Sequence, residues 1–230
     1  AGDDGFDTTG GWRGNAQFVL ITQTGAGNDR AFESDNNTSP NDALPETDGR
    51  VANVTVLRNN GDTSDVLKIR RGSSLGLYNV VMEADAGTCF DITDGDGNGN
   101  AATAELVAVN HDCATVTDAV DSDTWLANNA GQVQSYPSLL NGYVNSGAEN
   151  ASASTDMSAI NAFFTATSYP GAVVSCDNDW TAGWTIPGTL PAVDANACNA
   201  SLQVPVMGWA GLMALFGGLA AVARRNRRIV

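Results

Sequence analysis

Apolar, β-branched segments alternate with polar turns through the first half of the chain. Long segments lie at residues 16–21, 51–57, 77–82 and 104–109, and short ones at residues 5–8, 31–34, 67–70 and 89–92. Clusters of Gly, Asn and Asp separate them, as tight turns require. The short segments recur at Phe6, Phe32, Lys68 and Phe90, so the repeat is roughly 20 to 40 residues long. A repeat of this kind without helical periodicity predicts an all-β solenoid of stacked coils.

Two architectures can bury such strands. In a parallel β-helix, each coil covers its apolar face against the next coil, and insertions leave the stack as loops. In an antiparallel β-sandwich, the same strands would form two facing sheets. The uneven repeat favours the β-helix, with insertions chiefly at residues 36–50 and 93–103. We therefore predict β-helix coils over residues 1–113.

Residues 114–186 are less regular and are predicted to form an irregular and capping segment. Within it, Asp156 to Phe164 predicts a short amphipathic helix with Asp156 as its N-cap. The predicted apolar face of this helix consists of Met157, Ile160, Phe163 and Phe164. We expect the helix to protect the exposed strand edge at the end of the solenoid, together with the aromatic segment from Trp180 to Trp184. Sugar stacking is the alternative role for the two tryptophans.

The C-terminal residues 204–230 predict a membrane-spanning helix. No charged residue occurs over residues 204–223, which is long enough to cross a hydrocarbon core of roughly 30 Å. The arginines that follow would stay on the cytoplasmic side; they are Arg224, Arg225, Arg227 and Arg228. A buried core helix is the alternative, but the apolar residues run all round the helix rather than along one stripe. Residues 187–203 are predicted to link the folded body to this tail.

The charge balance excludes one class of partner. The chain carries a net charge of −15, and all 26 acidic residues precede residue 204. Nucleic-acid binding needs a basic face, so we exclude it. The chain begins at Ala1 without an initiator Met or export signal, and we expect an N-terminal part of an exported precursor to precede it.

Four cysteines predict disulfides in an exported chain. They are Cys89, Cys113, Cys176 and Cys198, and an even number favours pairing. Pairing of neighbours, Cys89 with Cys113 and Cys176 with Cys198, is the simplest of the three connectivities. Zinc binding is the alternative, but no two cysteines are closely spaced and His111 is the only histidine.

One loop has the spacing of a calcium site. Its pattern is Asp-x-Asp-x-Asn-Gly followed after five residues by Glu. The predicted ligands are Asp94, Asp96, Asn98, the backbone carbonyl of Asn100, and Glu105. A plain Asp/Gly/Asn-rich surface turn between two coils is the alternative, and the flanking segments predict strands rather than helices.

Catalytic signals are weaker. The cations available on the coils are Arg58, Lys68, Arg70 and Arg71, and an Arg-Arg pair on a strand more often neutralises neighbouring carboxylates than abstracts a proton. Glycoside hydrolysis uses a pair of carboxylates, but the chain has so many acidic residues that their presence does not distinguish an enzyme from a non-enzymatic protein. No nucleophile pattern accompanies His111, so we interpret it as structural.

Motifs at both ends of residues 1–186 resemble one family. Near the start they are Gly-Asp-Asp-Gly-Phe-Asp at residues 2–7, Gly-Trp-Arg-Gly at residues 11–14, Gln-Phe at residues 17–18, and the segments at residues 29–31 and 33–37. The closing motifs are Phe-Phe at residues 163–164, Tyr-Pro-Gly-Ala-Val at residues 169–173, and the Trp-containing residues 179–185. They are similar to exported bacterial right-handed parallel β-helix (pectin-lyase-like) surface proteins of unassigned activity. The resemblance implies the fold and a surface location rather than a chemistry.

The tail resembles bacterial C-terminal sorting signals. Val204 and Pro205 stand where that family has Ile/Val-Pro-Thr-Leu, with Val206 and Met207 in place of Thr and Leu, and Trp209 follows. The resemblance implies that a sorting protease can remove the tail after export.

Together these observations favour a non-enzymatic structural or adhesive β-helix protein, stabilised by calcium. The expected location is the outer side of the membrane, or the cell surface and its surroundings after tail cleavage. The expected partners are the membrane, a sorting protease, surface polysaccharides and neighbouring surface proteins. The alternative is a polysaccharide lyase or hydrolase whose active site lies largely outside this fragment. A cleft with converging carboxylates and a basic residue near Arg58 to Arg71 would favour that enzyme, whereas a smooth acidic wall would favour the structural role.

Overall fold

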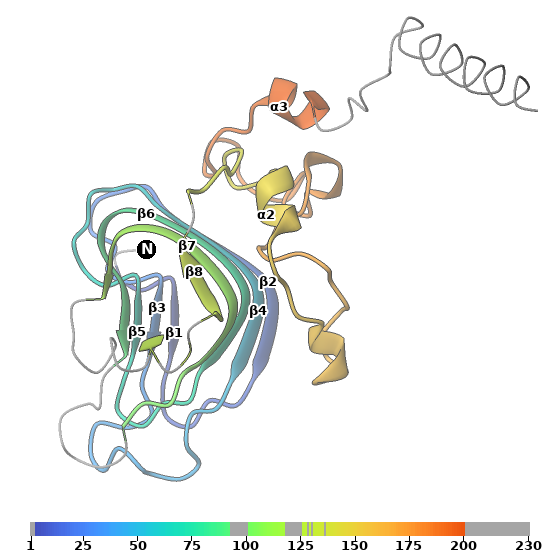
Figure 1. The fold of residues 1–230 in the computed structure, drawn as a ribbon. Helices are drawn as coiled ribbons and strands as arrows, with labels where there is room; N and C mark the ends of the chain where they lie inside the picture. Colours follow the sequence, from blue (N-terminus) through green and yellow to red (C-terminus); the bar gives the residue numbers. More distant parts are fainter. Residues whose placement is uncertain are drawn as a thin grey trace, which may run out of the picture. The chain divides into compact units, whose positions relative to one another are not determined.

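A computed structural model describes residues 3–92, 101–117, 126–127, 129, 131–135 and 137–200. Within them, short and long strands alternate along the chain (Figure 1). The short strands are β1 (Phe6–Thr8), β3 (Phe32–Ser34) and β5 (Leu67–Ile69). The long strands are β2 (Asn15–Gln23), β4 (Arg50–Arg58), β6 (Gly76–Ile92) and β7 (Glu105–Thr117), and β8 (Val133–Ser135) follows.

Every strand pairs in parallel with its equivalent in the next coil. One stack runs from β1 through β3 and β5 to the end of β6, and the other runs from β2 through β4, β6 and β7 to β8. Parallel pairing between successive coils is the arrangement of a β-helix, and it excludes the antiparallel sandwich. The pairing also continues past residue 113, because β7 pairs with β8.

The register corrects one member of the repeat. Phe6 pairs with Phe32, Phe32 with Leu67, and Leu67 with Phe90. Leu67, and not Lys68, is therefore the equivalent of the phenylalanines. Since side chains alternate between the two faces of a strand, the apolar residue points into the coil and Lys68 points out of it.

The interior of the coils is a continuous apolar stack. Phe32, Leu67, Phe90, Val56 and Met82 are all at most 1% exposed within it. Phe6 and Trp12 pack against the same cluster from the first described coil, with their rings edge to face at a centroid distance of 5.8 Å. No coil can bury such residues alone, so the stacking of coils supplies the hydrophobic stabilisation.

Each long strand bends at a non-glycine residue in the left-handed conformation. Phe18, Asn53, Asn79 and Ala108 have φ values of 59°, 51°, 56° and 55°. They occupy equivalent positions, because the residues flanking them pair with one another from β2 to β7. We call these four residues the left-handed column. Asparagine tolerates this conformation better than most residues, which explains its presence in the two middle coils.

A segment of residues 152–173, which we call the strap, crosses the outside of the long strands. Asn110 donates to Ser152, Asn79 exchanges hydrogen bonds of 2.8 and 2.7 Å with the backbone of Thr155, and Gln17 exchanges two with Thr165. Figure 1 shows the strap, in yellow to orange, alongside β2 and β4.

The strap returns across the middle coils on a second line of contacts. Asn53 donates to the Tyr169 carbonyl at 2.9 Å, Gly171 N–H donates to the Asn79 carbonyl at 2.8 Å, and Ala172 N–H donates to Thr55 at 2.8 Å. It thus joins four successive coils through hydrogen bonds that are independent of the sheet.

The predicted helix from Asp156 to Phe164 is shorter than expected. Asp156 caps a single turn of 3-10 helix at Met157–Ala159 by accepting from Ser158 N–H. Met157 and Phe164 are buried against Ala52 and Tyr78, which belong to two different coils. Ile160 and Phe163, by contrast, are 53% and 56% exposed. The segment therefore lies along the side of the coils, where outward-facing apolar residues receive it.

Three other short helices follow β8. They are α2 (Gly147–Ala151), the 3-10 turn Cys176–Asn178, and α3 (Ala195–Ala200). Ser146 and Glu149 form a capping box on α2, and Glu149 also accepts from Leu139 N–H at 2.8 Å. Burial raises the pKa of Glu149, but these hydrogen bonds lower it by more.

The chain divides into two compact units, residues 1–194 and residues 195–230. The predicted membrane tail at residues 204–230 lies outside the described residues. Among the residues that the structure does describe, no helix combines the length and apolar character that crossing a membrane requires.

We predict that Gly171→Ala destabilises the protein more than Gly27→Ala does. Both glycines have a left-handed φ, 82° and 85°, so each substitution costs about 1 kcal/mol of backbone strain. At Gly171 a Cβ would also lie 2.6 Å from Asn145 Oδ1 and 3.1 Å from Thr55 Oγ1, whereas Gly27 has open space. Urea unfolding should show a loss of about 2–4 kcal/mol for Gly171→Ala. Equal losses would mean that the strap is not tightly seated.

Candidate functional site

Charged residues cover the outside of the short strands. Asp7, Glu33, Lys68 and Asp91 occupy one register position on β1, β3, β5 and β6. Paired strands lie about 4.8 Å apart, so successive charges in this line are close neighbours. We call the wider group the charged face; it consists of Asp4, Asp7, Asp29, Arg30, Glu33, Asp35, Asp65, Lys68, Arg70, Arg71 and Asp91.

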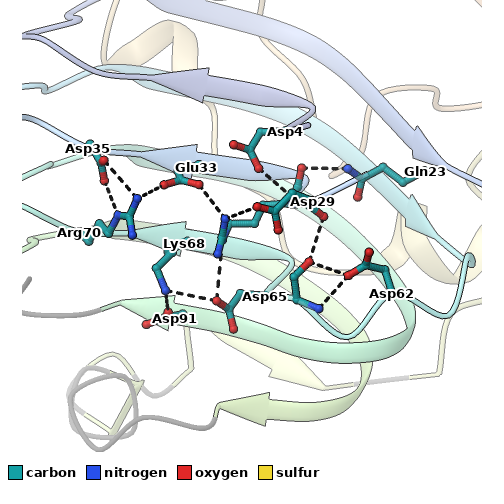
Figure 2. Close-up of polar contacts among 12 residues, drawn as sticks. Asp4, Gln23, Asp29, Glu33, Asp35, Asp62, Asp65, Lys68, Arg70 and Asp91 are labelled. Carbon is teal, nitrogen blue, oxygen red and sulfur yellow. Dashed lines mark hydrogen bonds and ion pairs between the residues drawn. The ribbon is translucent and has the colours of Figure 1, made fainter. Parts of the chain in front are cut away.

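Cations on the charged face are held in ion pairs with its carboxylates (Figure 2). Lys68 bridges Asp91 and Asp65, the latter at 3.3 Å. Arg30 contacts Asp29 at 2.5 Å and Glu33 at 2.8 Å.

The two adjacent arginines share one carboxylate. Arg70 pairs with Glu33 and, at 2.8 Å, with Asp35, while Arg71 lies 2.9 Å from Asp35. Burial lowers the pKa of Arg70, but its hydrogen bond to Asp35 and the nearby negative charges raise it by more. The interpretation of the Arg-Arg pair as neutralising neighbouring carboxylates fits these contacts.

Burial and neighbouring negative charges raise the pKa of three carboxyl groups, those of Asp4, Asp7 and Asp65. Burial and the charge of Asp91 raise the pKa of Asp65, although Lys68 opposes the change. Burial raises the pKa of Asp4 to about 6, in spite of the hydrogen bond from Arg30 N–H, and nearby Glu33 and Asp29 add to the effect. Burial and the charges of Glu33 and Asp35 raise the pKa of Asp7. Asp4 is thus the carboxyl group that can exchange a proton near neutral pH.

Arg58 lies apart from the charged face. Its side chain is fully buried and contacts Asp62 at 2.6 Å and Ser64 at 2.8 Å. Its Nε and Nη1 have no partner among the described residues. The Ser64 backbone and hydroxyl, more than Arg58 itself, lower the pKa of Asp62. A guanidinium buried in this way braces the loop after β4 and is not accessible to a polymer.

Carboxylates also gather at the start of the first described coil. Ligand atoms of Asp3, Asp4 and Asp29 lie within 4.8 Å of one another, a donor set of the kind that calcium prefers. Of the predicted calcium loop, Asp94, Asp96, Asn98 and Asn100 lie outside the described residues. Glu105 is exposed at the start of β7 and accepts a hydrogen bond from Tyr78.

The cysteines form disulfides as predicted. Cys89 is bonded to Cys113, with their Cα atoms 5.9 Å apart, which links β6 to β7. Cys176 and Cys198 are also disulfide-bonded. His111 lies close to the Cys89–Cys113 pair, edge-on to Phe90, and burial lowers its pKa. Since thiolates are the form that binds metal, the disulfide disfavours the zinc alternative there.

Sequence reasoning named three cations of this site, Lys68, Arg70 and Arg71, but it missed Arg30 and the arrangement of all four. The signal was present in Asp7, Glu33, Lys68 and Asp91, each of which follows the apolar residue of a short strand. Recognising it required the register, which the misplaced third repeat had shifted by one position.

We predict that Lys68→Met destabilises the protein by about 1–3 kcal/mol at neutral pH. Without Lys68, Asp65 and Asp91 face each other with only Arg30, 3.8 Å from Asp65, to compensate them, and the pKa of Asp65 rises further. A carboxyl group whose pKa is raised by folding costs stability as the pH rises. The loss relative to wild type should therefore be largest near pH 7 and smaller near pH 4 in urea unfolding.

Arg13→Met is the matched control, because Arg13 pairs with Asp48 at 3.0 Å while 53% exposed. An exposed pair of this kind contributes about 0.5 kcal/mol or less. Equal effects of the two substitutions would contradict a stabilising role for Lys68 in the charged face.

Comparison with known proteins supports the fold. The model of a family described as pectate-lyase-like β-helix domain matches residues 1–185. No curated protein and no solved structure matches the chain significantly. The match covers the coils, the charged face and the strap, and the observed parallel stacking agrees with it. The chain belongs to the family of pectate-lyase-like β-helix domains.

Proposed function

We propose that this protein is a non-catalytic β-helix scaffold with a structural or adhesive role at the cell surface. The observation that carries the proposal is the state of its charged face. Arg30, Lys68, Arg70 and Arg71 each lie within 4 Å of a carboxylate. A proton-abstracting base must be free to reach its substrate, whereas these cations neutralise their neighbours.

Cross-linking of the coils supports the same proposal. The strap bonds to Gln17, Asn53, Asn79 and Asn110, and the Cys89–Cys113 disulfide joins β6 to β7. A stack tied by hydrogen bonds and a covalent link is suited to presenting a fixed surface. We place it on the outer side of a membrane, held or sorted by the C-terminal tail. Its proposed partners are surface polysaccharides and neighbouring surface proteins.

A depolymerisation assay tests the proposal. The purified full chain is incubated with uronate polymers and with neutral polysaccharides, and new reducing ends and unsaturated products are measured. We expect neither to form above the level of a heat-denatured sample. Products that form with the wild type and vanish in an Asp4→Asn variant that unfolds like the wild type would overturn the scaffold role.

A carbohydrate-cleaving enzyme is the second candidate, and one observation favours it. Asp4 has a pKa of about 6, in the range of a general acid of glycoside hydrolysis. Asp29 lies within 4.8 Å of it, counted between carboxylate oxygens. On this alternative Asp4 protonates the leaving oxygen, so cleavage should fall with rising pH above about 6 and disappear in Asp4→Asn.

We also propose that calcium stabilises the protein, at the loop from Asp94 to Glu105. Binding to the native state alone raises stability, by about 2.7 kcal/mol at a hundredfold excess over the dissociation constant. We expect the thermal midpoint of the full chain to be higher in calcium than in chelator. The shift should vanish in Asp94→Ala and persist in Asp4→Asn. If the calcium-dependent shift were lost in Asp4→Asn alone, the calcium site would instead be the cluster of Asp3, Asp4 and Asp29. If the wild type showed no shift, the proposal of calcium binding would be wrong.

A further inference from the structure

A groove lies on the outside of the first described coil, away from the charged face. It encloses about 710 Å³, a size that suits a small-molecule ligand. Its lining joins β2 to the end of the strap and the chain that follows it, and consists of Gln17, Phe18, Tyr169, Ala172, Val174, Asn178 and Trp180. Each of these residues is uncharged, which contrasts with the acidic composition of the chain.

One of two stacked indole rings lines this groove: Trp180 belongs to the lining, and Trp184, outside the lining, stacks on Trp180. Trp180 and Trp184 have ring centroids 5.7 Å apart and an angle of 23° between their planes. They remain 38% and 66% exposed, although burial would be the favourable state for rings of this size. Exposed aromatic surface that the fold does not bury is typical of binding sites.

Hydrogen bonds hold the two rings in place. Trp180 donates through Nε1 to the Ala172 carbonyl at 2.8 Å, and Trp184 donates to the Trp180 carbonyl at 2.6 Å. Asp179 accepts from Thr181 N–H at 2.9 Å and from the Tyr143 hydroxyl at 2.7 Å, which anchors the loop between the rings. The ring surface is therefore ordered before any ligand arrives, and little conformational entropy is lost on binding.

Phe18 supplies apolar surface from the opposite wall at the cost of backbone strain. It has a φ of 59°, which is unusual for a bulky residue. The equivalent position carries asparagine in the next two coils, Asn53 and Asn79, and there the amide binds the strap. Strained residues often mark ligand sites, and here the strain places an aromatic ring in the groove where the fold would favour an amide.

Polar groups accompany the rings. The Gln17 amide is fixed by Asn53 and by the backbone of Thr165, and Asn178 is held by Ser175. The Tyr169 hydroxyl makes no hydrogen bond to the described residues, and burial raises its pKa, so it stays a donor at neutral pH. Flat apolar surface bordered by neutral donors and acceptors matches the two faces and the hydroxyl edge of a pyranose ring.

We propose that this groove binds a neutral glycan of unmodified hexose units, with Trp180 and Trp184 stacking on the sugar rings. The groove lining carries no cation to offset a uronate, and the chain as a whole has a net charge of −15. Electrostatic complementarity therefore favours a neutral polymer over an acidic one. The inference deepens the proposed function by giving the scaffold a ligand. It rests on that function in one respect, which is that the protein binds the glycan without cleaving it.

Calorimetric titration of the full chain tests the site. The probes are neutral hexaoses of glucose, mannose and galactose, with galacturonate hexaose as the charged comparison. We expect at least one neutral hexaose to bind and the galacturonate to bind at least about tenfold more weakly. Absence of binding to all neutral probes, or stronger binding of galacturonate, would overturn the proposal.

Variants assign the binding to the groove. Trp184→Ala and Tyr169→Phe should each weaken it, the former by about tenfold, and Trp180→Phe should keep more affinity than Trp180→Ala. Phe163→Ala is the control, because Phe163 is an aromatic residue, 56% exposed, that neither lines the groove nor stacks on a lining ring. Unchanged affinity in Trp184→Ala and Trp180→Ala, or an equal loss in Phe163→Ala, would contradict the site.

Recovery of the probe separates this inference from the proposed function. Intact hexaose after binding supports both. Cleaved hexaose would overturn the non-catalytic role and leave the groove as a binding site, whereas no binding and no cleavage would overturn the groove and leave the scaffold.

Discussion

The left-handed column is the constraint on which the coils depend. A parallel coil must change direction to return to its start, and each long strand bends at one non-glycine residue with φ between 51° and 59°. Because the four residues stand in register, the turn is made at the same place in every coil and the strands on both sides keep their pairing. A coil that turned one residue earlier would reverse the orientation of its side chains.

The same column determines where the strap can bind. At a left-handed residue the strand bends, and the amides of Asn53 and Asn79 are directed outward, where they satisfy strap carbonyls and N–H groups. Asparagine thus has two roles at this position: its backbone adopts the left-handed conformation, and its side-chain amide binds the strap. In the first described coil the position holds Phe18, and Gln17 beside it makes the polar contact to the strap.

Stacking also imposes a cost on the charged face. Equivalent residues in adjacent coils are forced to within a strand spacing, so Asp7, Glu33 and Asp91 in one line would repel strongly. Lys68 interrupts this line from within, while Arg30 and Arg70 reach it from neighbouring positions. Burial beneath these long cations leaves Glu33 and Asp91 only 9% and 6% exposed. The face is consequently a compensated network and not an open row of carboxylates.

The sequence predicts the parts of this structure that repeat. Alternating long and short strands, the parallel coil and the Cys89–Cys113 pair all follow from local pattern and spacing. The strap could not be found in this way, because its bonds join residues such as Gln17 and Thr165 that share no pattern and are far apart in the chain. The sequence also does not predict which strap residues are buried. Met157 and Ile160 are both apolar, and Met157 is buried because it packs against outward-facing residues of β4 and β6.

The strap also has a consequence for the order in which the chain can assemble. Each coil pairs with its immediate predecessor, so coils can add one by one as a chain emerges from a ribosome or a translocation pore. The strap closes contacts over much longer sequence separations, up to that between Gln17 and Thr165, and such contacts form slowly. Until residue 173 has emerged, the outer side of the bends is uncovered, with Asn53 and Asn79 open to water. A chaperone or a neighbouring chain would meet this surface only during that interval.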